Sequence, residues 1–449
     1  MASFFIDQHG CAKNQTDGEL LCTYLEKAGF KFTDNPKKAN FIIINSCGFI
    51  ESAKKESINA VYNARAAYPE AKIILAGCLA ERYANDLYES MPELDGIFGN
   101  GDLSKITDYM KKVSAAYKKQ TRAAPQVFPQ AGVCAAERTR LFGFKGSAYV
   151  KITEGCSNNC SFCAIPLIRG AVRSRPSKEI VDEIKALVAT GIYEINLIGQ
   201  DLAAYSDKNN GLAELLEKIS KVKGNFIVRC LYIHPDHFNL NILEVFKKDK
   251  RFVPYFDIPF QSGDDQIIKA MNRKGTAKKY VALVKAIRKE LPQAVLRTTF
   301  LTGFPGETDE AALNTQEFLK KIAPMWSGCF AYSREEGTAA YSFKNRVPVR
   351  TAKARATALE QIQTKITRAS LEKYIGKELD VLIEEIIAPV EDEGLAIGRA
   401  WFMAPEVDGC VVVRYDADDK AQTDKIQSGI VVKVRILDCT GADLDARLL

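Results

Sequence analysis

Three cysteines lie close together in the run ITEGCSNNCSFC, as Cys156, Cys160 and Cys163. Structural zinc sites are closed by four ligands, whereas an iron–sulfur cluster held by only three thiolates leaves one iron open to another molecule. The chain has three histidines, and none of them is near this run in sequence. The spacing therefore predicts a reactive iron–sulfur cluster. A zinc site with a fourth ligand elsewhere in the chain is the alternative.

Three more cysteines, Cys11, Cys47 and Cys78, each follow a short apolar strand, in HGCAKN, NSCGFI and AGCLAE. Parallel strands bring their carboxyl ends to one edge of a sheet, where ligands bind in open α/β folds. We therefore expect the three thiols to meet and to form a second metal site, where the adjacent glycines let the backbone approach a bulky inorganic core. The alternatives are three buried apolar side chains and a Cys3His zinc site that uses His9.

Arginine and glycine residues beyond the cysteine run could bind charged groups. Arg169, Arg173 and Arg175 follow it in PLIRGAVRSRP, and guanidinium groups suit carboxylates and phosphates. They are expected to hold a carboxylate of a substrate or cofactor, unless they form a solvated basic loop. Gly303 and Gly306, in LTGFPGETDE, stand between a strand and a helix and could bring backbone amides to a ligand.

Several polar residues follow predicted strands, where their side chains would face the mouth of a barrel. His234 and His237, in YIHPDHF, are three residues apart, and capping or substrate contact is favoured over metal binding. The sequence has no GxSxG elbow, no Walker loop and no GxGxxG after its first strand, which argues against hydrolases, kinases and dinucleotide enzymes. The other strand-end residues are Gln200 and Asp201 after INLIG, and Gln261 and Ser262 after DIPF.

The elements that must position these residues divide the chain into segments. Residues 1–115 alternate the apolar strands SFFID, NFIIIN and KIILAG with helical patterns, which predicts an open parallel α/β sheet. Residues 116–139 contain two prolines and little periodicity, which predicts a linker. Residues 140–375 contain six strand–helix repeats, which predict a partial or closed (βα) barrel with its sites at the carboxyl ends of the strands.

The last segment, residues 376–449, is rich in short β patterns and turn signals, which predicts a small antiparallel barrel of about five strands. It holds sixteen acidic and eight basic residues, so its net charge is −8, while the whole chain carries +6. An acidic barrel repels nucleic acid and suits a basic partner.

The composition is that of an ordinary globular protein, with 47% apolar and 26% charged residues among 449. The N-terminus has no signal-peptide pattern and the apolar runs are too short to cross a bilayer, which predicts a cytoplasmic protein. In a reducing compartment, twelve cysteines favour metal or cluster ligands over disulfides. The six cysteines that we expect to be structural are Cys22, Cys134, Cys230, Cys329, Cys410 and Cys439.

At CSNNCSFC the chain resembles the radical S-adenosylmethionine enzymes. The resemblance implies that Cys156, Cys160 and Cys163 hold a 4Fe-4S cluster whose free iron binds the amino and carboxylate groups of S-adenosylmethionine. One electron then splits this cofactor to give a 5′-deoxyadenosyl radical. The residues that we expect to contact the cofactor are Phe162, close to its adenine, and Arg169, Gln200, Gln261, Ser262, Gly303 and Gly306.

Over nearly the whole chain, the layout of GCAKN, NSCGFI and GCLAE, then the radical motif, then a small β barrel, is similar to the methylthiotransferases. The similarity implies that Cys11, Cys47 and Cys78 bind a second 4Fe-4S cluster, which carries the sulfur to be methylated and inserted. One S-adenosylmethionine supplies the methyl group and another the radical, which removes hydrogen from an unactivated carbon. The barrel would be TRAM-like and recognise the substrate, and a flavodoxin-type reductant is the expected electron donor.

Two branches of this family modify an adenosine in tRNA or the β-carbon of an aspartate in ribosomal protein S-twelve. The stretches CAIPLIRGAVRSRP, IGQD, DIPFQSGDDQIIKAMNR and GRAWFMAPEVDG resemble the ribosomal-protein branch, although His9, and LAAY after GQD, depart from the family pattern. The acidic barrel agrees, because tRNA binding needs Lys and Arg. Methylthiolation of tRNA is the alternative. The rival from another class is a non-catalytic, ribosome-associated protein with structural zinc.

Overall fold

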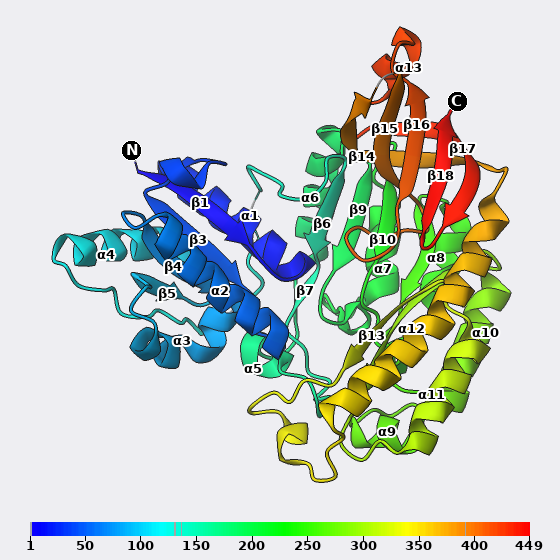
Figure 1. The fold of residues 1–449 in the computed structure, drawn as a ribbon, viewed down its shortest axis with the longest axis horizontal. Helices are drawn as coiled ribbons and strands as arrows, with labels where there is room; N and C mark the ends of the chain where they lie inside the picture. The colour runs from blue at the N-terminus through cyan, green and yellow to red at the C-terminus, as the bar shows by residue number, and fades with distance from the viewer. Residues whose placement is uncertain (1, 130–131, 136, 391) are drawn as a thin grey trace.

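The computed structural model describes residues 2–129, 132–135, 137–390 and 392–449. A parallel sheet, blue in Figure 1, lies beside a second parallel sheet in green and yellow. A closed barrel, in orange and red, lies over one end of the second sheet. Within the described residues, no helix combines the length and the apolar character that a membrane span requires.

The N-terminal sheet consists of the strands β1 (Ser3–Gln8), β2 (Lys31–Phe32), β3 (Phe41–Ser46), β4 (Lys72–Gly77) and β5 (Gly96–Phe98). Its helices are α1 (Ala12–Lys27), α2 (Glu51–Ala67), α3 (Cys78–Ser90) and α4 (Ile106–Lys118). The strands are parallel, in the order β2-β1-β3-β4-β5, which confirms the predicted fold of this part. Helices α1 and α4 cover one face and α2 and α3 the other, so β3 is buried along its whole length. The short edge strands β2 and β5 were not expected.

The segment after α4 first continues this sheet and then crosses to the central part. Gln126 exchanges backbone hydrogen bonds with the β5 region, to Ile97 at 2.9 Å and from Gly99 at 2.8 Å. Arg138 then donates to Glu19 on α1 at 2.5 Å and to Glu183 on α6 (Ser177–Ala189) at 2.7 Å. The crossing segment is therefore tied to both parts by buried ion pairs.

The central sheet consists of the strands β6 (Ser147–Lys151), β9 (Glu194–Ile198), β10 (Ile227–Cys230), β11 (Phe252–Asp257), β12 (Val295–Thr302) and β13 (Trp326–Ala331). All six are parallel, in the order β13-β12-β11-β10-β9-β6. They form a partial barrel, because β6 and β13 do not pair with each other. The main helices on its outer side are α6, α7 (Leu212–Ile219), α8 (Leu243–Lys248), α10 (Ala277–Glu290), α11 (Asp309–Ile322) and α12 (Val349–Leu371).

The C-terminal barrel is closed by five strands in the order β14-β15-β16-β18-β17. Four of its pairings are antiparallel, as predicted, but β16 and β18 pair in parallel. An odd number of strands cannot alternate in direction all the way around a closed barrel, so one parallel pair is required. The strands are β14 (Glu378–Val390), β15 (Glu393–Ala400), β16 (Val411–Asp416), β17 (Val431–Thr440) and β18 (Asp443–Leu448), with α13 (Lys420–Lys425) after β16.

Buried ion pairs dock this barrel onto the amino ends of the central strands. Glu194, the first residue of β9, accepts hydrogen bonds from Arg229 at 2.8 Å and from Arg399 of β15 at 2.7 Å. The Arg399 side chain also donates to Glu384 at 2.6 Å. The loop after β15 packs inside the partial barrel, where the backbone of Trp401 accepts from Arg229 at 2.8 Å.

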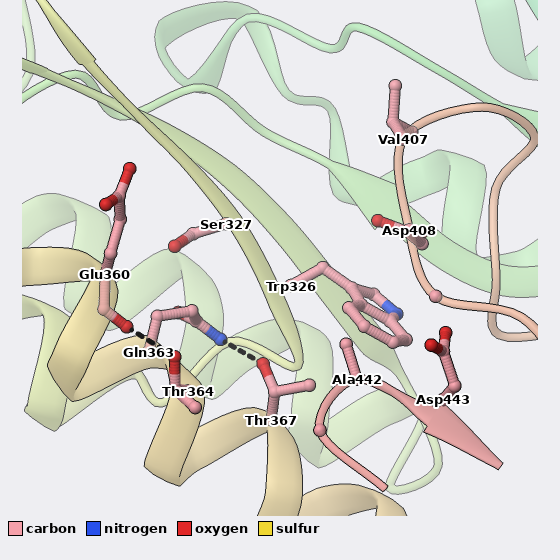
Figure 2. A pocket seen from close by; sticks show the side chains of 12 residues that line it. Trp326, Ser327, Glu360, Gln363, Thr364, Thr367, Val407, Asp408, Ala442 and Asp443 are labelled. Carbon is pink, nitrogen blue, oxygen red and sulfur yellow. Dashed lines mark hydrogen bonds between the residues drawn. The ribbon is translucent and has the colours of Figure 1, made fainter. Parts of the chain in front are cut away.

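Figure 2 shows a pocket at the same junction, between β13, α12 and the C-terminal barrel. The Gln363 side chain donates to Thr367 at 2.9 Å on one wall, and Trp326 forms another and donates to the backbone of Phe402 at 2.7 Å. Because Trp326 is the first residue of β13, this pocket lies at the amino ends of the strands. It is at the opposite end from the cysteine run.

The replacement Arg399→Met should loosen the docking of the C-terminal barrel. It leaves Glu384 without its buried cation and Glu194 with one cation of two, a class of change that costs about 3 kcal/mol or more. Both tryptophans of the chain, Trp326 and Trp401, lie at this junction. Tryptophan fluorescence during urea unfolding should therefore show a transition at a lower urea concentration than in the unmodified protein.

The matched control is Arg435→Met, which removes an exposed ion pair with Glu378 on the same barrel. Such pairs contribute about 0–1 kcal/mol, so this variant should unfold close to the unmodified protein. Equal midpoints for the two variants would contradict the role given to the buried pairs.

Candidate functional site

Cys11, Cys47 and Cys78 lie at one edge of the N-terminal sheet. Cys11 is in the turn between β1 and α1, Cys47 directly follows β3, and Cys78 begins α3 directly after β4. The three strands are paired up to their carboxyl ends. A side-chain carbon added to Gly10 would lie 3.1 Å from Cβ of Cys47, so the turn that carries Cys11 abuts Cys47.

Desolvation raises the pKa of these three thiols, and nearby positive charges lower it. Burial raises the pKa of Cys47 to about 12, and it raises the pKa of Cys78 against the charge of Arg169. Cys11 is exposed to solvent, and the charges of Lys13 and Arg169 outweigh its partial desolvation, so its pKa is lowered. Because iron binds thiolates, the two cations favour the form of the cysteines that holds a metal.

Cys156, Cys160 and Cys163 lie in the loop between β7 (Thr153–Glu154) and α5 (Ile165–Arg169), at the carboxyl end of β6. The backbone of Cys156 donates to Gly170 at 3.0 Å, and that of Cys163 donates to Cys160 at 3.0 Å. Burial raises the pKa of Cys163 to about 12, and the two neighbouring thiols add to the shift. The loop thus folds back on itself and gathers its cysteines.

Asp201 holds this loop against the ends of β9 and β10. Its carboxylate accepts from the Asn158 side chain at 3.0 Å and from the His234 backbone at 3.1 Å, and His237 Nδ1 lies 3.0 Å away. His234 Nδ1 accepts from the backbone two residues on, and its Nε2 lies 3.9 Å from Sγ of Cys160. Burial lowers the pKa of His234 to about 4, so this imidazole is neutral near pH 7.

The donor chemistry of both cysteine sets fits iron–sulfur clusters. In the described part of the chain, no three His, Cys, Asp or Glu side chains converge as tightly as one bound ion requires. A 4Fe-4S cluster is larger than one ion, so its thiolate ligands stand further apart. Near the loop of Cys156, Cys160 and Cys163, Gln200 donates to Glu154 at 3.4 Å, and its buried amide oxygen has no hydrogen-bond partner among the described residues. This acceptor suits a polar cofactor.

The other residues expected around the cofactor have mixed surroundings. Phe162 packs against an apolar cluster that includes Met271 and Phe304, and its ring lies 6.0 Å from the Arg273 guanidinium. Gln261 has φ of 70°, a strained conformation for a non-glycine residue that is kept where packing or function demands it. Its backbone is bonded to β12.

Ser262, Gly303 and Gly306 use their hydrogen-bonding groups within the protein. The Ser262 hydroxyl accepts from the backbone of Asp264 at 3.1 Å. The Gly303 amide donates to Glu307 at 2.5 Å, and the Gly306 amide donates to the backbone of Asn345 at 2.9 Å. These groups shape the turns before α9 (Asp265–Ala270) and α11, and their contact with a cofactor stays a prediction.

Arg169 is fully engaged between the two cysteine sets. It is the last residue of α5, the helix after Cys163, and its Nη1 donates to Glu154 at 2.5 Å. Its Nη2 lies within hydrogen-bonding distance of Asp17 at 2.8 Å, Asn14 at 2.7 Å and Sγ of Cys78 at 3.2 Å. The sequence placed this guanidinium on a carboxylate of a substrate or cofactor, whereas here it bonds to the protein's own acids and to a cysteine.

Lys151 completes a buried charge cluster, which we define as Asp17, Lys151, Glu154 and Arg169. Its ammonium donates to Glu154 at 2.6 Å and also to Asp17. Burial raises the pKa of Glu154, but Lys151 and Arg169 hold it well below its usual range. The cluster joins α1 to β6 and α5. Sequence reasoning missed its other three members, although each lies within a few residues of a cysteine motif.

The remaining charged candidates are also paired. Arg175 is buried and donates to the backbone of Lys151 at 2.8 Å and to Glu183 at 2.6 Å, so it is not part of a solvated loop. Arg173 donates to the backbone of Arg169 at 3.0 Å.

His9 lies between two carboxylates, 3.1 Å from Glu56 and 3.2 Å from Asp7. The contact with Asp7, aided by Glu56, raises the pKa of His9 to about 9 against the effect of burial. A protonated imidazole is not a zinc ligand, so this arrangement disfavours the Cys3His alternative.

Lys13 is a further residue that sequence reasoning missed. It lies in the first turn of α1, is 7% exposed, and has its ammonium 3.0 Å from the centre of the Tyr232 ring. Burial lowers the pKa of Lys13 to about 8. Its position two residues after Cys11 was the available signal.

Family comparisons divide the chain in the same way as the fold. Residues 3–99 match Uncharacterized protein family UPF0004, residues 150–319 match the Radical SAM superfamily, and residues 375–449 match the TRAM domain. The solved structure of the radical S-adenosylmethionine methyltransferase TsrM from Kitasatospora setae aligns over 73% of this chain and 72% of that protein. Its TM-score is 0.56 at 14% sequence identity, which shows a shared fold.

Curated relatives match over nearly the whole length. A ribosomal protein uS12 methylthiotransferase RimO from Treponema denticola is 52% identical over 98% of this chain and 99% of its own. The protein of the same name from Thermodesulfovibrio yellowstonii is 37% identical over 94% of this chain and 95% of its own. Together with the three matched regions, these relatives show that the chain belongs to the RimO family of ribosomal protein uS12 methylthiotransferases.

Proposed function

We propose that this protein inserts a methylthio group at the β-carbon of an aspartate in ribosomal protein uS12, the S-twelve protein of the small subunit. The observation that carries the proposal is the joining of two cysteine triplets by one side chain. Arg169 ends the helix after Cys163 and lies 3.2 Å from Sγ of Cys78. The two triplets therefore belong to one site, with one metal centre on each side.

Each triplet has its own part in this reaction. Cys156, Cys160 and Cys163 would hold a 4Fe-4S cluster that binds S-adenosylmethionine, and Cys11, Cys47 and Cys78 would hold a second cluster; when bound, these groups would supply a radical, a sulfur atom and a methyl group. The protein's own side chains orient and shield them. Asp201 fixes the loop of Cys156, Cys160 and Cys163, which we call the radical loop, through Asn158. Arg169 offsets the negative charge of the thiolate at Cys78.

The substrate is a protein and not a tRNA. The C-terminal barrel carries a net charge of −8, and three of its arginines and lysines, Arg414, Lys433 and Arg435, are already paired with acids of the barrel. Such a surface repels phosphates and attracts a basic ribosomal protein. We infer that the reaction takes place in the cytoplasm, where ribosomes are, with a flavodoxin-type protein as electron donor.

The test is an anaerobic reaction with reductant and S-adenosylmethionine, with uS12 and tRNA offered in parallel and both analysed by mass spectrometry. A methylthio gain on an aspartate of uS12 is the expected result. A gain on tRNA adenosine alone would overturn the choice of substrate, and retained activity with zinc in place of iron would overturn the chemistry.

The replacement Cys160→Ala should abolish cleavage of S-adenosylmethionine. It removes one of the three thiolates that would hold the open cluster. The measurement is formation of 5′-deoxyadenosine in the presence of reductant, with Cys410→Ala in the C-terminal barrel as the control that keeps it. Cleavage at the unmodified rate in Cys160→Ala would refute the assignment of this triplet.

The replacement Cys47→Ala should distinguish the roles of the two metal centres. Cleavage of S-adenosylmethionine should persist, because the radical loop is untouched, while the methylthio product on uS12 should disappear. Iron content should fall by about half, since one cluster of two is lost. Normal product formation by this variant would show that the N-terminal cysteines do not carry the sulfur.

A further inference from the structure

Lys13 is a buried cation without an acidic partner. It is 7% exposed, and the described residues offer its ammonium no hydrogen bond or ion pair, only the face of the Tyr232 ring at 3.0 Å. The other strongly buried lysine, Lys151, is paired with both Asp17 and Glu154. An aromatic face offsets only part of the cost of burying an ammonium. Lys13 is therefore suited to receive an anionic group.

The location of Lys13 is between the two cysteine triplets. It stands two residues after Cys11. Tyr232 lies in the loop after β10, two residues before His234, whose ring is 3.9 Å from Sγ of Cys160. One short loop thus carries both Tyr232, which contacts Lys13, and His234, which lies beside Cys160.

The Tyr232 ring is held in place under Lys13 by a strained backbone. Its φ is 67°, in the left-handed region that aromatic residues adopt only where the surroundings impose it. Its carbonyl accepts from the backbone of Leu202 at 3.0 Å, which fixes the loop to the end of β9. Strain of this kind gathers at ligand sites.

The other cations near this space have partners of their own. Arg169 is bonded to two acids, and Arg297 lies 3.4 Å from both Asp257 and Asp408. Cys11, and after it Asp257, contribute to the field at Lys13, and the Asp257 carboxylate lies 3.4 Å from Arg297.

Arg273, beside the loop of Cys156 and Cys163, is hydrogen-bonded to the Pro259 carbonyl at 2.5 Å and has no ion pair among the described residues. An anion that enters between the triplets therefore meets Lys13 on the side of Cys11 and Arg273 on the side of Cys163.

We propose that Lys13 binds the side-chain carboxylate of the target aspartate and thereby selects an acidic residue for methylthiolation. The proposal rests on the proposed function: the carbon to be modified must be reached from both triplets, and the carboxylate is one bond from that carbon. A charge-assisted hydrogen bond from a buried ammonium would hold the aspartate in place. S-adenosylmethionine carries a carboxylate too, so the test must separate the two sources.

The experiment measures equilibrium binding of two forms of uS12 to the cluster-loaded protein: the natural form, and one with the target aspartate replaced by asparagine. The unmodified protein should bind the aspartate form about 30-fold more tightly. Lys13→Met, which keeps the length and removes the charge, should bind both forms equally, and Lys13→Arg should keep the preference. Lys27→Met, the same change at an exposed position of α1, is the matched control and should also keep it.

Two results would overturn the inference. The first is an unmodified protein without preference for aspartate, and the second is a Lys13→Met variant that keeps the preference. If the variant that keeps the preference also binds S-adenosylmethionine more weakly, Lys13 is assigned to the cofactor's carboxylate instead. Iron content and thermal midpoint accompany each measurement; should Lys13→Met load poorly, Lys13→Gln gives the same comparison. Failure of the proposed function is separate, because it shows as no methylthio product on uS12 with the unmodified protein.

Discussion

The arrangement of the molecule depends on the buried charge cluster of Asp17, Lys151, Glu154 and Arg169, where the N-terminal sheet meets the partial barrel. Two cations and two anions neutralise each other there, and the loss of one would leave an opposite charge buried and unpaired, which is strongly destabilising. The pairs are short and mutually oriented, so they hold α1 in one position relative to β6 and α5. The position of α1 therefore fixes where Cys11 lies relative to Cys156, Cys160 and Cys163.

The rest of the site follows from this constraint. Once α1 is fixed, its first turn places Cys11 and Lys13 over the mouth of the partial barrel, where Tyr232 lies beneath the ammonium. The radical loop is fixed independently by Asp201, and Arg169 spans the distance between the two triplets. The opposite end of the barrel is occupied by the loop after β15, anchored through Glu194 and Trp326. The radical loop therefore lies at the carboxyl ends of the strands, and the acidic C-terminal barrel is attached at their amino ends.

The sequence predicted the features that depend on local pattern. Apolar strands followed by cysteines predicted the N-terminal sheet and the edge where Cys11, Cys47 and Cys78 lie, and six strand–helix repeats predicted the central sheet. It did not predict contacts between residues far apart in the chain. Arg169 and Asp17 are separated by 152 positions, and no local pattern encodes their pairing. Ser262, Gly303 and Gly306 were expected at the cofactor because strand ends and glycine loops often bind ligands; the structure shows their hydrogen bonds within the protein, and the contact with a cofactor stays a prediction. The parallel pairing of β16 with β18 follows from counting strands around a closed barrel, a global property.

The central claim is that both triplets act on one carbon of one aspartate. The most direct measurement uses uS12 labelled with deuterium at the β-carbon of the target aspartate, with mass spectrometry of both the protein product and the 5′-deoxyadenosine. The account predicts that deuterium lost from the methylthiolated aspartate appears in 5′-deoxyadenosine. Methylthiolated product that keeps all of its deuterium, with unlabelled 5′-deoxyadenosine, would contradict it.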